Sequence, residues 1–203
     1  MKRRAISLLL AAVLVLASGA AVFADGMDYS QWNSQSAYPS DVVNTKLFTP
    51  VKFLVDKKVI EGYEDGLFHA ERNITRAEYT KMILIATNNH NNLDAYTVND
   101  FTDVDGHWAK QYINTAVGLK LINGMGDGTF RPDDTVTYAQ VVALLLRAKG
   151  ISDSDMKAYG SWPDNYAKYA TMYNMLGDVS VSDWNAPAVR GDVAKILYRN
   201  LPK

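Results

Sequence analysis

A repeat with a period of 62 residues constrains the fold of this chain more than any other feature of its sequence. When the sequence is shifted by 62 places without gaps, turn and capping residues align, as in Asp41 and Asp103, Gly62 and Gly124, Asp65–Gly66 and Asp127–Gly128, Phe68 and Phe130, and Thr75–Glu78 and Thr137–Gln140. So many matches at one offset indicate a structural unit that occurs at least twice. Units of this length bury too little apolar surface to fold alone, so we expect them to share one core.

Each unit is predicted to form a helix, a glycine-rich loop and a second helix. In the second unit, the segment Gly124–Gly128 contains three glycines and an aspartate, which tolerate the positive φ angles of a tight turn. Thr137 and Gln140 form a capping box, and the apolar segment Val141–Leu146 follows. The predicted fold class is therefore all-α, with repeat 1 at residues 38–90 and repeat 2 at residues 98–150.

A degenerate third repeat is predicted at residues 160–203. It is supported by two resemblances, of Tyr166–Tyr169 to Trp108–Gln111 and of Ala188–Asp192 to Ile74–Glu78. Its glycine-rich loop is missing, and Val189 has no side-chain oxygen with which to cap the last helix. We therefore expect Arg190, which follows Val189, to be less firmly positioned than Arg76 in repeat 1.

The N-terminal segment has the pattern of a cleaved secretory signal at residues 1–24, with basic residues at Lys2–Arg4 and an apolar run at Ile6–Val22. Residues 25–37 form a polar lead-in. Cleavage removes three of the 21 Lys and Arg residues, leaving 18 against 22 Asp and Glu, a net charge of −4. A mildly acidic chain is poorly suited to nucleic-acid binding. The sequence has no Cys, which excludes disulfides, and no later segment is apolar enough to cross a membrane.

The repeated motifs resemble the S-layer homology domain, a family usually present as three tandem repeats near a terminus of bacterial cell-surface proteins. The family pattern is approximately Phe-x-Asp-Val-x-x-His-Trp-Ala, then Gly-x-x-Asp-Gly-Thr-Phe-x-Pro, then Thr-Arg-Ala-Glu. Repeat 2 matches the first two motifs at residues 101–109 and 124–132, and repeat 1 matches the third at Thr75–Glu78. The three repeats cover nearly all of the chain after the signal.

This resemblance implies a pseudo-threefold assembly of helical hairpins, with one helix from each repeat in a central bundle. It also implies non-covalent attachment to the bacterial cell wall, through binding of an anionic, often pyruvylated, secondary cell-wall polysaccharide. The protein would then be secreted and retained in the wall or surface layer. The alternative is a structural surface-layer or adaptor protein whose repeats mainly contact other cell-surface proteins.

The candidate ligand-binding residues are Arg76, Asp103, Trp108, Gly62, Gly124, Asp41 and Arg190. Arg76 beside spare amides of a helix N-terminus would suit a carboxylate, although a solvated arginine is the simpler interpretation. The two aspartates most simply cap turns, the two glycines serve backbone geometry, and Trp108 either fills the core or faces a sugar ring. A groove between repeats 1 and 2 is expected to combine Arg76 with Asp103.

The repeats also depart from the family pattern, each in a different way. Repeat 1 has Lys46 where repeat 2 has Trp108, repeat 2 has Tyr138 in place of the arginine, and repeat 3 lacks the loop. The other two grooves are therefore expected to be impaired.

Neither a metal site nor a catalytic site is expected. The three histidines, His69, His90 and His107, are scattered and lack the spacing of zinc ligands. There is no nucleophile elbow and no phosphate-cradling loop ending in Lys-Ser/Thr. The chain is therefore predicted to be a binding protein without a cofactor, not an enzyme.

Overall fold

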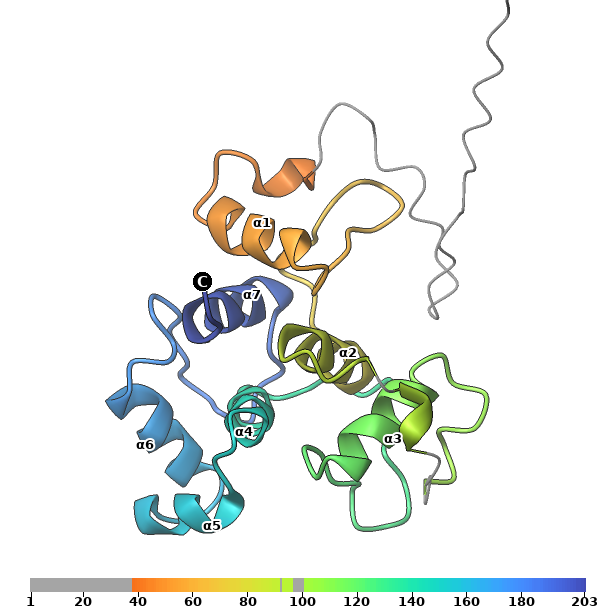
Figure 1. The fold of residues 1–203 in the computed structure, drawn as a ribbon. Coiled ribbons are helices and arrows are strands. Elements are labelled where there is room, and N and C mark those ends of the chain that lie inside the picture. The colour runs from red at the N-terminus through yellow and green to blue at the C-terminus, as the bar shows by residue number, and fades with distance from the viewer. Residues whose placement is uncertain (1–37, 92, 97–100) are drawn as a thin grey trace, which may run out of the picture.

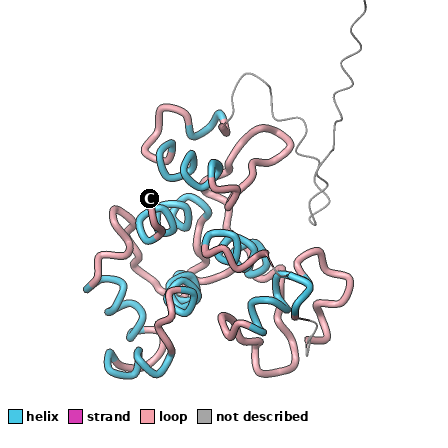
Figure 2. Tube along the Cα trace, in the orientation of Figure 1, coloured by secondary structure: helices cyan, strands magenta, loops and turns pink. Residues whose placement is uncertain are grey.

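The computed structural model describes residues 38–91, 93–96 and 101–203. Within these ranges it contains seven α-helices and no strands, which confirms the all-α fold class (Figures 1 and 2). The helices are α1 (Phe48–Asp56), α2 (Arg76–Ala86), α3 (Lys110–Gly118), α4 (Tyr138–Ala148), α5 (Asp153–Met156), α6 (Asp164–Met172) and α7 (Arg190–Asn200). Short 3-10 turns lie at η2 (Ser40–Val42), η3 (Leu93–Ala95) and η4 (Lys157–Tyr159).

The predicted signal at residues 1–24 and lead-in at residues 25–37 lie outside the described residues. In the part of the chain that the structure does describe, no helix has the length and apolar character needed to cross a membrane.

The two predicted capping boxes are present at the starts of α2 and α4. The Thr75 hydroxyl accepts a hydrogen bond from the Glu78 amide at 3.1 Å, and the Glu78 carboxylate accepts one from the Thr75 amide at 2.8 Å. Thr137 and Gln140 exchange the same two bonds. Helix α7 begins after Val189 without a side-chain cap, as the sequence predicts. Local sequence therefore determines where α2 and α4 begin.

The segments that lead into α2, α4 and α7 are joined by a closed cycle of three backbone hydrogen bonds. The Ile74 amide donates to Ala188 O at 3.1 Å, the Val136 amide to Ile74 O at 3.0 Å, and the Ala188 amide to Val136 O at 2.8 Å. All three side chains are buried. The cycle brings the three helix starts together at the centre of the molecule (Figure 1).

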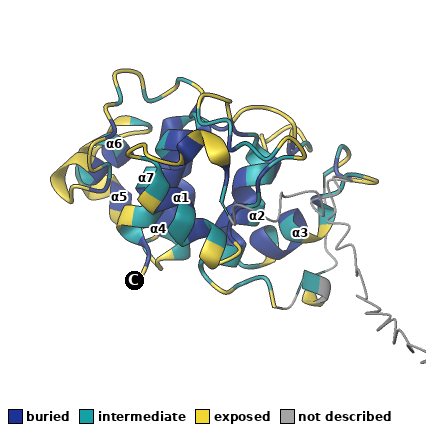
Figure 3. Cartoon of the chain, turned by 90° about the horizontal axis from the view of Figure 1, so that it is seen from above, coloured by how far each residue is buried: buried dark blue, intermediate teal, exposed yellow. Residues whose placement is uncertain are grey.

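The outer helices α1, α3 and α6 each pack on an inner helix, one of α2, α4 and α7, from a different repeat. Helix α1 packs on α7, α3 on α2, and α6 on α4 (Figure 1). The buried residues that result form one cluster that runs through all three repeats (Figure 3). Residues before the predicted third repeat also contribute, because Met156 at the end of α5 is buried in this cluster. The core is therefore common to all three units.

We predict that a fragment spanning residues 98–150 does not fold alone. It retains α3 and α4 but loses α2, on which α3 packs, and α6, which packs on α4. Circular dichroism of the fragment should show little helix and no cooperative melting, whereas the full chain should unfold in one transition. A sigmoidal thermal transition of the isolated fragment would contradict the shared core.

Candidate functional site

Two grooves between the repeats contain five of the seven predicted site residues, all except Asp41 and Asp103. The first, here called the Arg76 groove, has a volume of about 320 Å³ and is lined by Arg76, Tyr79, Asn123, Gly124, Phe130, Leu144, Arg147 and Trp162, among others. The second, the Arg190 groove, has a volume of about 180 Å³ and is lined by Glu61, Gly62, Tyr63, Arg72, Glu78, Lys81, Trp108 and Arg190, among others. Each groove is built from all three repeats.

Arg76 stands at the first residue of α2 and reaches the loop of repeat 2. Its Nε donates to Phe130 O at 2.9 Å, and an Nη lies 3.5 Å from Asn123 O. The guanidinium carbon lies 4.4 Å from the centre of the Phe130 ring, a cation–π contact. Burial lowers the pKa of Arg76, while the carboxylates of Asp134 and Asp103 act in the opposite direction. The cation is thus held at a fixed place in the groove and remains charged.

The helix start beside Arg76 does not offer spare amides, and the sequence-based expectation on this point is wrong. The Arg76 amide donates to Asp134 O at 2.9 Å, and the Ala77 amide donates to Pro132 O at 2.9 Å. Both amides are satisfied by the loop of the neighbouring repeat. Recognition of an anion in this groove would therefore depend on the guanidinium, not on the helix N-terminus.

Asp103 and Asp41 hold the glycine-rich loops in place. The Asp103 carboxylate accepts hydrogen bonds from the amides of Phe130 and Arg131 at 2.9 and 2.7 Å. Asp41 accepts the equivalent bonds from Phe68 and His69 at 2.8 and 2.9 Å. Burial alone would raise the pKa of Asp103, but the amide donors outweigh it and lower the pKa below its ordinary value. The Asp103 carboxylate acts to raise the pKa of Arg76, but Asp103 does not line the Arg76 groove.

Gly124 is required because there is no room for a side chain. A Cβ at this position would lie 2.2 Å from Cε1 of Phe101 and 2.8 Å from Thr129 O. The positive φ angles of the loop occur instead at Gly126 and Gly128, at +85° and +82°. Gly62 is buried at the matching place in the Arg190 groove.

Arg190 is more firmly held than the sequence suggests. Only 7% of the residue is exposed, its Nε donates to Phe68 O at 3.1 Å, and an Nη donates to Glu61 O at 2.9 Å. Its guanidinium also lies about 5 Å from the rings of Tyr63 and Phe68. The expectation of a poorly defined Arg190 is therefore wrong, because bonds to the loop of repeat 1 replace the missing N-cap.

Trp108 lies in the Arg190 groove, apart from Arg76. It is partly buried, packs beside His107 with ring centres 5.4 Å apart, and has Lys81 Nζ at 6.0 Å from its ring. The predicted residues thus divide between two places. Arg76 and Gly124 line the Arg76 groove, with Asp103 supporting its loop, and Arg190, Gly62 and Trp108 line the Arg190 groove, with Asp41 supporting its loop.

Sequence comparison within the chain missed Trp162. The structure places Trp162 two residues before α6, as Trp108 lies two residues before α3, so the outer helices match at a shift of 54 residues. Trp162 is 48% exposed and lines the Arg76 groove. Tyr166, which the sequence comparison paired with Trp108, is instead the third residue of α6 and is buried. The sequence signal that could have pointed to Trp162 is its position directly before Pro163.

A third groove lies where repeat 3 meets repeat 1, and we call it the Lys46 groove. It has a volume of about 600 Å³ and is lined by Lys46, Asn174, Leu176, Gly177, Asp178, Lys195, Tyr198, Arg199 and Lys203, among others. Tyr138 takes the arginine's place in its repeat, and its hydroxyl donates to Asp192 at 2.7 Å. Two departures from the repeat pattern, Lys46 and the altered loop of repeat 3, thus lie in this one groove, whereas Tyr138 does not line it. The Arg76 and Arg190 grooves each retain an arginine, a loop and a tryptophan.

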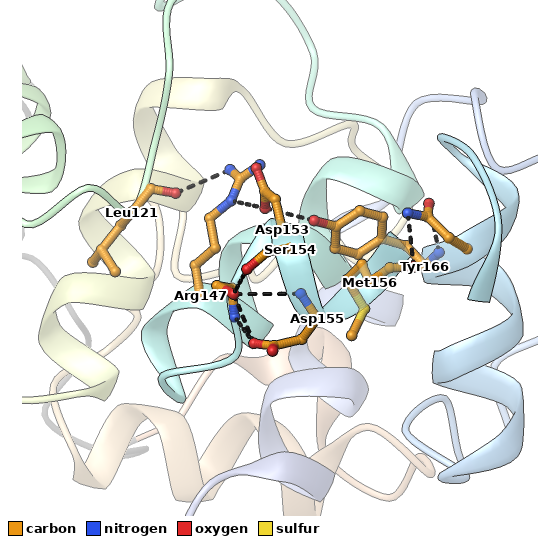
Figure 4. Close-up of polar contacts among 9 residues, drawn as sticks. Leu121, Arg147, Asp153, Ser154, Asp155, Met156 and Tyr166 are labelled. Carbon is orange, nitrogen blue, oxygen red and sulfur yellow. Dashed lines mark hydrogen bonds and ion pairs between the residues drawn. The ribbon is translucent and has the colours of Figure 1, made fainter. Parts of the chain in front are cut away.

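A polar network joins α4, α5 and α6 beside the Arg76 groove (Figure 4). Arg147 Nε and Nη donate to the two oxygens of Asp153 at 2.7 and 3.0 Å, and a second Nη donates to Leu121 O at 3.1 Å. The Tyr166 hydroxyl donates to the same Asp153 at 2.6 Å. Hydrogen bonds from Arg147 are the chief reason that the pKa of Asp153 lies below its ordinary value. The network fixes the outer wall of repeat 3 against repeat 2.

Among the described residues, no group of three or more His, Asp or Glu side chains is arranged to hold a metal ion.

We predict that Gly124→Ala destabilises the chain by about 1–3 kcal/mol, because the new methyl group must displace Phe101 or the loop backbone. The free energy of unfolding in urea measures this. The matched control is Asn123→Ala, since Asn123 is exposed on the same loop. A Gly124→Ala variant as stable as the wild type would contradict the steric cause.

We predict that Asp153→Asn lowers stability at pH 7 and that the difference from the wild type narrows as the pH falls below about 4. A carboxyl group whose pKa is lowered in the folded state stabilises the fold at pH values above its ordinary pKa. This contribution is lost as the carboxylate becomes protonated. Melting temperatures between pH 3 and pH 7 provide the measurement. Asp164→Asn is the control, because Asp164 is exposed on α6 and forms no ion pair among the described residues. A pH-independent difference would contradict the assignment.

Comparisons with known proteins identify the repeats. The family model of the S-layer homology domain matches residues 40–80 and 100–142. The chain is 31% identical over 149 residues to the middle cell wall protein of Brevibacillus brevis, covering 72% of this chain and 14% of that protein. It is 30% identical over 168 residues to the surface layer protein of Brevibacillus choshinensis, covering 82% and 14%. It is also 31% identical over 123 residues to the cellulosome-anchoring protein of Acetivibrio thermocellus, covering 59% and 28%.

The matched relatives are much longer than this chain, which spans at most 28% of these three. They are cell-surface and surface-layer proteins, and the domain is known for anchoring such proteins to the cell wall. The chain belongs to the S-layer homology domain proteins and carries at least two repeats of that domain.

Proposed function

We propose that this chain attaches non-covalently to the bacterial cell wall by binding an anionic, pyruvylated secondary cell-wall polysaccharide. The observation that supports this most is the composition of the Arg76 and Arg190 grooves. Each combines a fixed guanidinium, a tryptophan and a tightly turned backbone, contributed by three different repeats.

The chemistry of the grooves suits an acidic sugar. A guanidinium binds a carboxylate through two parallel hydrogen bonds, and a tryptophan face packs against the apolar side of a sugar ring. In the Arg76 groove, Arg147 is already neutralised by Asp153, so Arg76 is the cation available to a ligand. A pyruvate ketal supplies the single carboxylate that such a site needs.

We propose that Arg76 contributes more to ligand binding than Arg190, because more of its guanidinium is accessible. Arg190 is almost completely buried, and its Nε and one Nη are used by Phe68 O and Glu61 O. Arg76 is half-buried, and its longer contact to Asn123 O at 3.5 Å is weak. Asp103, Asp41, Gly62 and Gly124 would then support the ligand site by shaping the loops.

The proposed mode of action is binding without catalysis or cofactor. We further propose that the protein is exported through the N-terminal signal. We also propose that its three repeats have a pseudo-threefold arrangement around a central bundle of α2, α4 and α7. The cyclic hydrogen bonds of Ile74, Val136 and Ala188 support this arrangement. Relatives named as cell wall, surface layer and anchoring proteins support the location.

We predict that Arg76→Ala weakens binding to purified cell-wall sacculi by about tenfold or more, since a charge-assisted hydrogen-bonded pair contributes about 1.5–3 kcal/mol. Arg76→Lys should restore only part of the affinity, because an ammonium group cannot form the paired bonds. Arg190→Ala should mainly lower the melting temperature. Co-sedimentation with sacculi gives the affinities, and added salt should weaken all of them.

Sacculi stripped chemically of the secondary polymer serve as the control for the ligand. Retention of the protein on stripped sacculi would show that the polysaccharide is not the ligand. Retention that instead requires other surface proteins would favour the adaptor function.

A further inference from the structure

The Lys46 groove has a charge unlike that of the other two grooves. Four basic side chains line it, from Lys46, Lys195, Arg199 and Lys203, and Asp178 supplies the one lining carboxylate side chain. With a volume of about 600 Å³ it is also larger than the Arg76 and Arg190 grooves, at about 320 and 180 Å³. This concentration of positive charge occurs on a protein whose formal net charge is negative.

The basic residues of this groove have few acidic partners. Lys195 Nζ lies 3.3 Å from Asp178, but Lys46, Arg199 and Lys203 form no ion pair among the described residues. Burial and the neighbouring cations Arg199 and Lys57 lower the pKa of Lys203. Cations that crowd together raise the free energy of the unliganded protein, and a bound anion relieves this repulsion.

Arg199 shows the contrast most directly. It occupies the place in α7 that Arg147 occupies in α4, since each is the tenth residue of its helix. Arg147 is neutralised by both oxygens of Asp153, whereas Arg199 Nε donates to the backbone carbonyl of Asn174, which carries no charge. The loop passes closely over Arg199 at Gly177, where a Cβ would lie 3.1 Å from Arg199 Cδ. The arginine is therefore positioned by the loop, without an acidic partner among the described residues.

Helix dipoles do not account for this cluster. Arg199 and Lys203 lie at the C-terminal end of α7, where a cation is favourable. Lys46, however, directly precedes Leu47, the N-cap of α1, and a cation near a helix N-terminus is unfavourable. Lys195 lies in the middle of α7. The convergence of these two lysines on one groove is thus not a by-product of helix capping.

The Lys46 groove is also unsuited to the ligand proposed for the other two. Lys46 stands where Trp108 and Trp162 stand in their repeats, so no tryptophan is available to a sugar ring. Tyr138 holds the place in its repeat that Arg190 and Arg76 hold in theirs, but it does not line the groove, and its hydroxyl donates to Asp192. What remains is the guanidinium of Arg199 and the ammonium groups of Lys46, Lys195 and Lys203, of which Lys203 Nζ donates to Tyr198 O. Ammonium groups bind phosphate as point charges.

We propose that the Lys46 groove binds a polymer of phosphodiester groups, as a second ligand distinct from the acidic sugar. An open groove with several cations suits a chain that presents one negative charge per repeating unit. Each lysine would contact a phosphate, and Arg199 would contact another. This site depends on none of the residues assigned to the Arg76 and Arg190 grooves.

The test is calorimetric titration of the full chain with a synthetic glycerol-phosphate oligomer. Lys46→Ala should weaken binding about fivefold, and Lys46→Ala with Lys195→Ala by more than about tenfold. The slope of the logarithm of affinity against the logarithm of salt concentration should become shallower, by about one phosphate contact for each lysine removed. Lys168→Ala is the matched control, since Lys168 is exposed on α6 outside the groove, and it should change affinity less than about twofold.

Further measurements distinguish phosphate binding in the Lys46 groove from binding elsewhere on the protein and from general attraction of anions. Arg76→Ala should leave affinity for the oligomer within about twofold, so the two proposals can fail independently. Polyglutamate of equal charge and vesicles containing phosphatidylglycerol should both bind more weakly than the oligomer. No binding of the oligomer, equal losses for Lys46→Ala and Lys168→Ala, or equal binding of polyglutamate or vesicles would overturn the proposal.

Discussion

The cycle of backbone hydrogen bonds through Ile74, Val136 and Ala188 is the constraint on which the rest of the structure depends. Three segments far apart in the sequence each donate to one neighbour and accept from the other, so none of them can be satisfied by a single repeat. The cycle lies in the buried core, where an unpaired amide or carbonyl would cost about 1–3 kcal/mol. Removing one repeat would therefore leave unpaired groups in both of the others.

The same cycle determines how the grooves form. Immediately after it, the first amide of each inner helix donates to a carbonyl of the neighbouring repeat, from Arg76 to Asp134, from Tyr138 to Ala186, and from Arg190 to Arg72. This fixes the first side chain of each helix over the neighbour's loop. Arg76 and Arg190 then reach loop carbonyls with their side chains as well. The joining of the helix starts therefore places an arginine in each of two grooves. The first amides of the helices are used in this joining and are not available to a ligand.

Sequence reasoning was most reliable where the physical cause is local. The helices of the all-α class and the capping boxes of Thr75 and Thr137 depend on residues within a few positions of one another, and the structure contains them. It failed for Arg190, whose position depends on carbonyls more than 120 residues away. It failed again for Trp162, because repeat 3 follows two different shifts, 54 residues for its outer helix and 52 for its inner helix relative to repeat 2.

The exchange of partners between repeats explains how three unequal repeats can leave two complete grooves. Each groove takes its arginine position, its loop and its tryptophan position from three different repeats. Lys46, Tyr138 and the altered loop of repeat 3 look like three separate defects along the sequence, one in each repeat. In the folded chain Lys46 and the altered loop lie in a single groove, whose cationic lining differs from that of the others. A substitution in one repeat can thus change one groove's chemistry while the shared core and the other two grooves stay as they were.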